Sequence, residues 1–307
     1  MSLHSQFPNI FTRYFYIFCI TWLGIIFLGL FISIIFDFSI NLISIPLQIK
    51  SFIWSFLIVS ISTFAIYNQS GLPEIKNISI KAPKLSENMK IGYLSDVHID
   101  GVHSINYLNK IIDILNKQKL DLVLINGDLV DGASFEKHSF KTLDRLNVPV
   151  YITLGNHESY IGNDFAKSLF TETKARVLEN EVVNYKGLEI LGIQDMFGIK
   201  NKQNEILLDK ILSNMKWDSE KTSIMVLHEP IGSEIADKYG VNIQLAGHTH
   251  NGQIWPFNYV VKLVFPRVLG LYKIGNLSLY VGPGTGTWGP PMRLGSRNEI
   301  TIITLEK

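Results

Sequence analysis

A single aspartate, Asp128, occupies a position from which its carboxylate could bridge two metal ions. It follows the apolar run 122–125, which is typical of a buried β-strand, and Gly127, which allows a tight turn after that strand. Asp128 is therefore expected at the carboxyl end of a strand, the edge of an open α/β sheet at which ligands collect. Its two oxygens could each contact a different ion.

Four other apolar runs also end in polar residues that can bind metal. Any one of them alone is weak, because an isolated aspartate after a strand usually belongs to a turn or caps a helix. Five of the eight histidines fall in these turns, however, so chance is a poor explanation. The only cysteine, Cys19, lies in an apolar run, which leaves nitrogen and oxygen ligands. The candidate residues in the four turns are Asp96 and His98, Asn156 and His157, His228, and His248 and His250.

Alternating strands and helices would place these turns at one edge of a sheet. Parallel strands need helical crossovers, so the pattern predicts an α/β domain. The pattern also predicts an extended segment over 76–89, a hairpin over 182–193 and a second hairpin turning at Gly275-Asn276. Further strands are expected over 90–94, 148–154, 222–227, 241–246 and 299–305, and helices over 104–115, 133–146, 165–170 and 201–215.

The amino-terminal region is apolar enough to enter a membrane. Residues 14–36 carry no charge and could span a bilayer, and residues 51–67 form a second stretch near the short limit for a span. We expect an anchor of one or two helices in 1–72 and a catalytic domain in 73–307. A cleaved signal is disfavoured because no small residues follow the first stretch, and a hairpin buried in a soluble protein would lack a partner.

Lysine and arginine near the spans predict the side on which the domain lies. Arg13 precedes the first span and four lysines follow the second, against Lys50 between them. Two spans then place the domain in the cytoplasm at the inner membrane, and a single span would reverse this. The net charge of +1 gives no general reason to expect nucleic acid, and the sequence does not indicate an oligomeric state.

The motifs resemble those of the calcineurin-like metallophosphoesterase superfamily. They are, in order, Asp96-Val97-His98, Gly127-Asp128-Leu129-Val130-Asp131, Gly155-Asn156-His157-Glu158, His228 and Gly247-His248-Thr249-His250. The resemblance covers about residues 90–307. It implies an α/β fold of two packed β-sheets flanked by helices, a four-layer sandwich, and hydrolysis of a phosphate ester.

The resemblance also implies a role for each site residue. It assigns Asp96, His98 and His250 to one metal, Asn156, His228 and His248 to the other, and Asp128 to both. His157 would contact the phosphate, with Asp131 orienting its ring; the alternative for Asp131 is to cap the following helix. Glu158 and Glu229 could support the ligands or be solvated. We expect two divalent ions, with manganese the first choice and iron, zinc, magnesium or cobalt as alternatives.

Departures from the superfamily pattern narrow the range of expected substrates. Protein Ser/Thr phosphatases continue the second motif with Arg-Gly, whereas Gly132-Ala133 follows here. The carboxyl-terminal run from Gly284 to Arg293 resembles a bacterial membrane-anchored branch, some of whose relatives hydrolyse UDP-2,3-diacylglucosamine in lipid A synthesis while others act on simple phosphodiesters. Arg293 could contact a diphosphate or pair with a surface carboxylate. The apolar segment 254–272 could lie at the bilayer surface, or pack in the core or beneath the anchor.

We therefore expect a membrane-anchored hydrolase of a phosphodiester or diphosphate bond in a nucleotide-linked lipid, whose partners are the bilayer and this substrate. The alternatives are a phosphodiesterase of a soluble or cell-envelope substrate, and a membrane scaffold that has lost catalysis. A nuclease would need a basic groove or stacking aromatic residues beside the site, and neither is evident.

Overall fold

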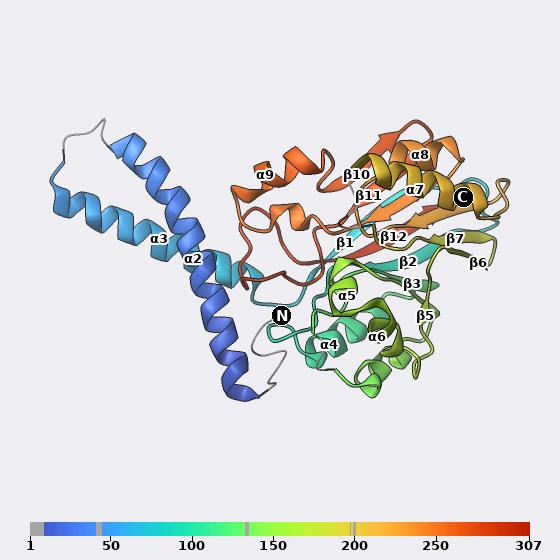
Figure 1. Cartoon of the computed structure of the whole chain (residues 1–307), viewed down its shortest axis with the longest axis horizontal. Helices are drawn as coiled ribbons and strands as arrows, with labels where there is room; N and C mark the ends of the chain where they lie inside the picture. The colour runs from blue at the N-terminus through green and yellow to red at the C-terminus, as the bar shows by residue number, and fades with distance from the viewer. Residues whose placement is uncertain (1–8, 41–44, 133–134, 197, 199–200) are drawn as a thin grey trace.

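Two six-stranded mixed β-sheets form the centre of the catalytic region (Figure 1). The computed structural model describes residues 9–40, 45–132, 135–196, 198 and 201–307. In spatial order the first sheet contains β1 (Glu74–Lys81), β12 (Glu299–Glu306), β2 (Met89–Leu94), β3 (Leu122–Asn126), β4 (Val150–Thr153) and β5 (Arg176–Val177). The second contains β10 (Gly270–Ile274), β11 (Leu277–Val281), β9 (Ile243–Ala246), β8 (Thr222–Val226), β7 (Leu188–Gly192) and β6 (Glu181–Tyr185).

The central strands are apolar on both faces because both faces are covered. In β3, Leu122 and Leu124 face the core between the sheets, while Val123 and Ile125 face the helices on the outer side. In β8, Ile224 joins the same inter-sheet core. Strands buried on both faces read as continuous apolar runs, which is why the sequence predicts them well.

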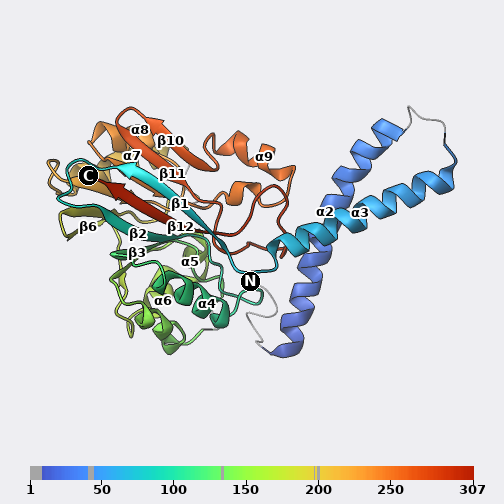
Figure 2. The same ribbon diagram turned by 180° about the vertical axis from the view of Figure 1, so that it is seen from behind.

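Helices complete the outer layers. The first sheet is covered by α4 (Ile105–Asn116), η1 (Lys137–Arg145), α5 (Asn156–Ile161) and α6 (Asn163–Ser168), and the second by α7 (Asn201–Asn214) and α8 (Ser233–Lys238). Figure 2 shows the same layers from behind. This arrangement confirms the predicted four-layer α/β sandwich.

Two long apolar helices, α2 (Ile10–Ile40) and α3 (Leu47–Gln69), project from one side of the sandwich (Figures 1 and 2). Both are long and apolar enough to cross a membrane, as predicted, and both are longer than the predicted stretches. They pack together through apolar side chains, and the indole of Trp54 donates a hydrogen bond of 2.9 Å to Ser33 Oγ. The division of the chain at residue 72 stays a prediction; α3 ends at Gln69 and β1 begins at Glu74.

Several elements differ from the sequence-based predictions. The extended segment over 76–89 overlaps strand β1, which begins at Glu74 and pairs in parallel with β12. The helix predicted over 133–146 is a 3-10 helix over Lys137–Arg145, and its predicted start lies outside the described residues. The helix predicted at 165–170 is α6, which begins at Asn163 and is preceded by a separate helix, α5, that begins at Asn156. The sequence also gave no signal for α8 or for α9 (Phe257–Val264), which lies on the side of the sandwich nearest α2 and α3 (Figure 1).

Candidate active site

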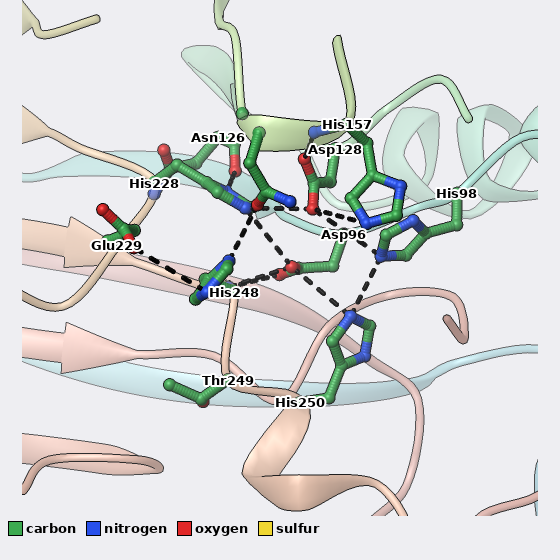
Figure 3. A network of polar contacts seen from close by, with 12 residues as sticks. Asp96, His98, Asn126, Asp128, His157, His228, Glu229, His248, Thr249 and His250 are labelled. Carbon is green, nitrogen blue, oxygen red and sulfur yellow. Dashed lines mark hydrogen bonds and ion pairs between the residues drawn. The ribbon is translucent and has the colours of Figure 1, made fainter. Parts of the chain in front are cut away.

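The predicted ligands gather where the carboxyl ends of the two sheets meet. Asp96 follows β2, Asp128 follows β3, Asn156 follows β4, His228 follows β8 and His248 follows β9. In Figure 3 the imidazoles of the histidines converge on the carboxylates of Asp96 and Asp128. Three overlapping groups could each hold a metal ion, with their ligand atoms within 4.8 Å of one another. They are Asp96, His98 and His250; His98, Asp128 and His157; and Asp128, His228 and His248.

The first group matches one predicted metal site. His98 Nε2 lies 2.9 Å from His250 Nε2, and His250 Nε2 lies 3.5 Å from Asp96 Oδ1. The Nδ1–H of His98 donates to Asp131 Oδ1 at 2.7 Å, which turns Nε2 into the group. A carboxylate that orients the ring in this way is characteristic of histidine metal ligands.

The third group contains the fully buried His228. Its Nδ1–H donates to the backbone oxygen of Asn126 at 2.9 Å, which turns Nε2 into the cluster. Nε2 lies 3.1 Å from Asp128 Oδ2, and although burial lowers the pKa of His228, Asp128 outweighs this effect and raises the pKa well above its usual value. The imidazole and the carboxylate therefore need a positive charge between them, which is a proton where no metal is bound. A divalent ion satisfies this need, so these residues fit the metal that the sequence predicts. Asn156 Oδ1 lies 2.9 Å from His248 Nδ1, beside this group.

Asp128 lies between the first and the third group. Its Oδ2 is 3.9 Å from His98 Nε2 as well as 3.1 Å from His228 Nε2, and its Oδ1 accepts the backbone N–H of His157 at 2.9 Å. Burial alone would raise the pKa of Asp128, but His228 and the neighbouring histidines hold it well below its usual value. The side chain is thus an ionised carboxylate at the centre of the cluster. Its predicted role as the shared ligand stays a prediction, as does the division of the other ligands between two ions.

His157 and Asp131 form a pair beside the ligands. Asp131 Oδ1 lies 2.9 Å from His157 Nδ1, and the same oxygen contacts His98, which the sequence did not indicate. Burial lowers the pKa of His157, but the contacts with Asp131 and Asp128 outweigh it and raise the pKa. The following helix, η1, is capped by Glu136, so the alternative capping role for Asp131 is wrong.

Glu158 fixes the backbone of two ligand loops. It is 1% exposed and accepts hydrogen bonds from the backbone N–H groups of Asp128, Val130 and Gly155 at 2.9, 2.9 and 2.7 Å. Of the two roles open from the sequence, support of the ligands is therefore the one that the structure shows. Glu229 is also buried, with Oε1 3.8 Å from His248 Nε2.

The ligand loops adopt sparsely populated backbone conformations. Asp96, His98, Asp128, His248 and His250 all have positive φ, between 47° and 66°. Non-glycine residues rarely adopt this region, and where they do the strain is often part of a functional site. Gly127 also has positive φ, and a Cβ there would lie 2.5 Å from His228 Nδ1, so only glycine fits this turn.

Arg293 has neither of the roles considered from the sequence. It is 0% exposed and donates hydrogen bonds of 2.7 Å to the backbone oxygens of Pro283 and Gly286. Its Nη2 also lies 3.2 Å from His250 Nδ1. Arg293 therefore holds the carboxyl-terminal loops against the site. The sequence could not show this, because an arginine on the surface cannot be distinguished in a sequence from a buried arginine that donates to carbonyl oxygens.

One wall of the site comes from residues that the sequence did not place there. A pocket of about 510 Å³ is lined on one side by six of the predicted residues. On the other side lie Leu23, Gly24 and Phe27 of α2, together with Phe257 and neighbouring apolar residues of the α9 region. Part of the segment 254–272 packs beneath the anchor, because Ile254 is buried in a cluster with Leu28 and Ile32 of α2, whereas α9 contains no buried residue. Its Phe257 instead packs edge-to-face against Phe27, with ring centroids 6.0 Å apart.

Comparisons with known proteins agree with the chemistry of the site. Residues 89–252 match the family model described as calcineurin-like phosphoesterase. An uncharacterized metallophosphoesterase of Campylobacter jejuni is 34% identical over 83% of this chain and 70% of its own length. A transmembrane protein with metallophosphoesterase domain from Bos taurus is 30% identical over 80% of this chain and 60% of its own length. The chain thus spans about two thirds of the length of these curated relatives.

Among solved structures, a dimetal phosphatase from Danio rerio is 13% identical, with a TM-score of 0.41 over 64% of this chain and 88% of the other. The family model and the sequence relatives carry the assignment, and the Asp and His clusters agree with the dinuclear metal chemistry of the family. The chain belongs to the calcineurin-like phosphoesterase family of metal-dependent phosphoesterases.

Proposed function

We propose that this protein is a membrane-anchored hydrolase that uses two divalent metal ions, manganese first, to cleave a phosphodiester or diphosphate bond in a lipid-linked substrate. One observation carries the proposal: metal-binding side chains and residues of an apolar, membrane-type helix line the same pocket of about 510 Å³. A phosphate at the ligands would then lie beside surfaces suited to hydrocarbon. The presence of every expected ligand favours an enzyme over a scaffold.

The residues of the chain supply orientation and a proton. When bound, two divalent ions neutralise phosphate oxygens and lower the pKa of a bound water. His157 faces the pocket and, with its pKa raised by Asp131, holds a proton that it can donate to the leaving oxygen. Asp131 keeps both His157 and His98 in place, because one of its oxygens, Oδ1, contacts both rings. Glu158 fixes the backbone of Asp128.

UDP-2,3-diacylglucosamine, a lipid A precursor, is the first substrate to test, because it joins a diphosphate to acyl chains. A simpler lipid phosphodiester is the second candidate. Among the described residues that line the pocket none is lysine or arginine, whereas the diphosphate of a nucleotide gains from such cations. A water-soluble phosphodiester is the third candidate.

We place the protein in the inner membrane with its catalytic domain in the cytoplasm. Two apolar helices and a relative that is named a transmembrane protein support membrane association. Lys76 and Lys81 follow the second helix, and lysines near span ends favour the cytoplasmic side. Protease digestion of inverted and right-side-out vesicles tests the side: cleavage of the domain only in inverted vesicles supports it, and cleavage only in right-side-out vesicles overturns it.

The function is tested by manganese-dependent hydrolysis in detergent micelles. UDP-2,3-diacylglucosamine, a lipid phosphodiester and a water-soluble aryl phosphodiester are compared, with the Asp128→Asn protein as the control. Faster turnover of either lipid supports the proposal. Hydrolysis of the soluble ester alone keeps the chemistry and overturns the lipid substrate. No hydrolysis of any of them by a metal-loaded protein favours the scaffold.

A further inference from the structure

Helix α2 is docked on the catalytic domain along much of its amino-terminal half. Arg13 Nε donates a hydrogen bond of 2.7 Å to the backbone oxygen of Gly101, close to the ligand loop that follows β2. Eleven residues further on, Gly24 lies against the loop that contains Pro290 and Met292. A Cβ at Gly24 would lie 2.6 Å from Met292 Sδ, so a glycine is needed for this close approach. The helix is thus fixed relative to the metal ligands and is more than a tether.

The docked part of α2 forms one side of the pocket, and α9 forms another. Leu23, Gly24 and Phe27 contribute the α2 side, while Phe257 and Val261 contribute the α9 side. The two helices meet at the edge-to-face pair Phe27–Phe257. The metal-binding groups lie at the polar side of the same pocket, so a ligand held by its phosphate has hydrocarbon surfaces next to it.

The apolar surface continues outward from this wall. On α2, Trp22 and Leu23 are 55% and 62% exposed. On α9, Tyr259 and Leu263 are 59% and 86% exposed. Apolar residues this exposed on two adjacent helices are expected at a membrane surface, where lipid replaces water as their neighbour.

We propose that the space between α2 and α9 is the acyl-chain subsite of the enzyme, with Phe27 and Phe257 forming its gate to the bilayer. The occupant is a hydrocarbon chain of the same molecule whose phosphate lies at the metal ligands. The membrane helix α2 is then part of the substrate site. This inference rests on the proposed hydrolase function and specifies how a lipid reaches it.

A second exposed side of the pocket accounts for substrates that lack a chain. Tyr160 and Trp288 also line the pocket and are 61% and 52% exposed. A small water-soluble ester can reach the ligands past these residues. The subsite therefore predicts that kcat/KM depends on the length of the alkyl chain. Hydrolysis of the smallest ester measures catalysis without the subsite.

The experiment compares p-nitrophenyl ethyl, octyl and tetradecyl phosphates, which share a leaving group and differ only in the alkyl chain. For the full-length protein in micelles, kcat/KM should rise with chain length. Phe27→Ala and Phe257→Ala should each lower the ratio of tetradecyl to ethyl kcat/KM about tenfold, because an aromatic contact with the chain is lost. Phe38→Ala, which removes an 81% exposed phenylalanine from the same helix, should leave the ratio unchanged.

A tetradecyl phosphonate with a terminal photoreactive diazirine provides a readout independent of turnover. Its crosslinks should map to α2 and α9, also in the Asp128→Asn protein provided that this variant retains metal. Crosslinks confined to other elements, a wild-type rate that ignores chain length, or an unchanged ratio in both phenylalanine variants would overturn the subsite. Failure to hydrolyse even the ethyl ester would instead count against the proposed function, and the crosslinks would still test the subsite.

Discussion

The two walls of the pocket are built in opposite ways. The polar wall follows strands of two sheets, and its residues His98 and Asp128 are 0% and 2% exposed, with hydrogen bonds or ion pairs on several sides. The apolar wall consists of helices α2 and α9, which meet through side chains such as Phe27 and Phe257 and expose much of their remaining surface. No residue of α9 is buried.

Because of this difference, we expect the polar wall to determine the chemistry and the apolar wall to determine which substrates can enter. Hydrogen-bonded groups in a packed interior have one arrangement, which suits ligands that must hold metal and phosphate in fixed geometry. Helix α9 has no buried residue and contacts α2 through a few side chains, so it can move away from α2 with little loss of free energy, which suits the passage of a flexible chain. Changes in the polar wall should therefore affect every substrate, and changes in the apolar wall only those with a chain.

The largest expected effect is that of Asp128→Asn. Two of the three metal-binding groups contain the carboxylate of Asp128, which is predicted to bind both ions. Turnover of every substrate should therefore fall about 10³-fold or more, since several kcal/mol of charge stabilisation disappear. Activity and metal content, the latter by mass spectrometry of the purified protein, check this. Membrane insertion should be unaffected. Normal activity on any substrate would refute the central role of Asp128.

The second effect is that of His157→Ala. Loss of a proton donor should lower turnover about 10² to 10³-fold on soluble and lipid esters alike. Metal content should stay close to that of the wild type, because His157 is predicted to contact phosphate and not metal. His138→Ala, at a histidine whose side chain is 70% exposed, is the matched control. A large loss of metal in His157→Ala would make this residue a ligand.

A third and smaller effect is expected for Glu158→Gln. The amide retains a single acceptor oxygen for the three backbone N–H groups that the carboxylate now binds. The ligand loops should loosen, and metal affinity should fall about 10 to 100-fold, as for other groups that orient ligands. Titration of the apoprotein with manganese measures this. Glu136→Gln, on an exposed carboxylate, should bind manganese like the wild type.

The polar wall could be predicted from the sequence because it has local signatures. Each ligand directly follows an apolar run, and the ends of neighbouring strands must lie close together. Asp96, Asp128 and Asn156 illustrate this, since each occupies the turn after its strand. The same reasoning gave the α/β class, whereas the four layers followed from the resemblance.

The apolar wall could not be predicted in this way. Gly24 and Met292 are far apart in the sequence, and nothing in either segment indicates that they touch. Residues on a helix that is apolar all round carry no pattern that marks one face. Arg293 was misjudged for a related reason, since most of its partners are backbone oxygens, which leave no trace in the sequence.

The smallest effect concerns the rigidity of the polar wall away from the ligands. His103 is 4% exposed, stacks on Tyr107 and accepts the backbone N–H of Thr287 on Nε2 at 3.1 Å, so its ring is neutral. Burial lowers the pKa of His103 to about 3, with a contribution from the charge of His98. Below about pH 6.5 the unfolded chain binds a proton that the folded protein does not, so stability falls as the pH decreases toward 3.

Between pH 6.5 and 5 this loss should amount to about 1.5 kcal/mol of unfolding free energy. His103→Gln keeps a polar side chain that does not titrate. It should be less stable than the wild type at neutral pH, yet lose about 1.5 kcal/mol less over this range. Denaturant unfolding of the detergent-purified protein at several pH values measures the slope, and His138→Gln, at an exposed histidine, should keep the wild-type slope. An identical slope in His103→Gln would mean that the ring is protonated in the folded protein, and that the loop around Thr287 is less rigid than the rest of the polar wall.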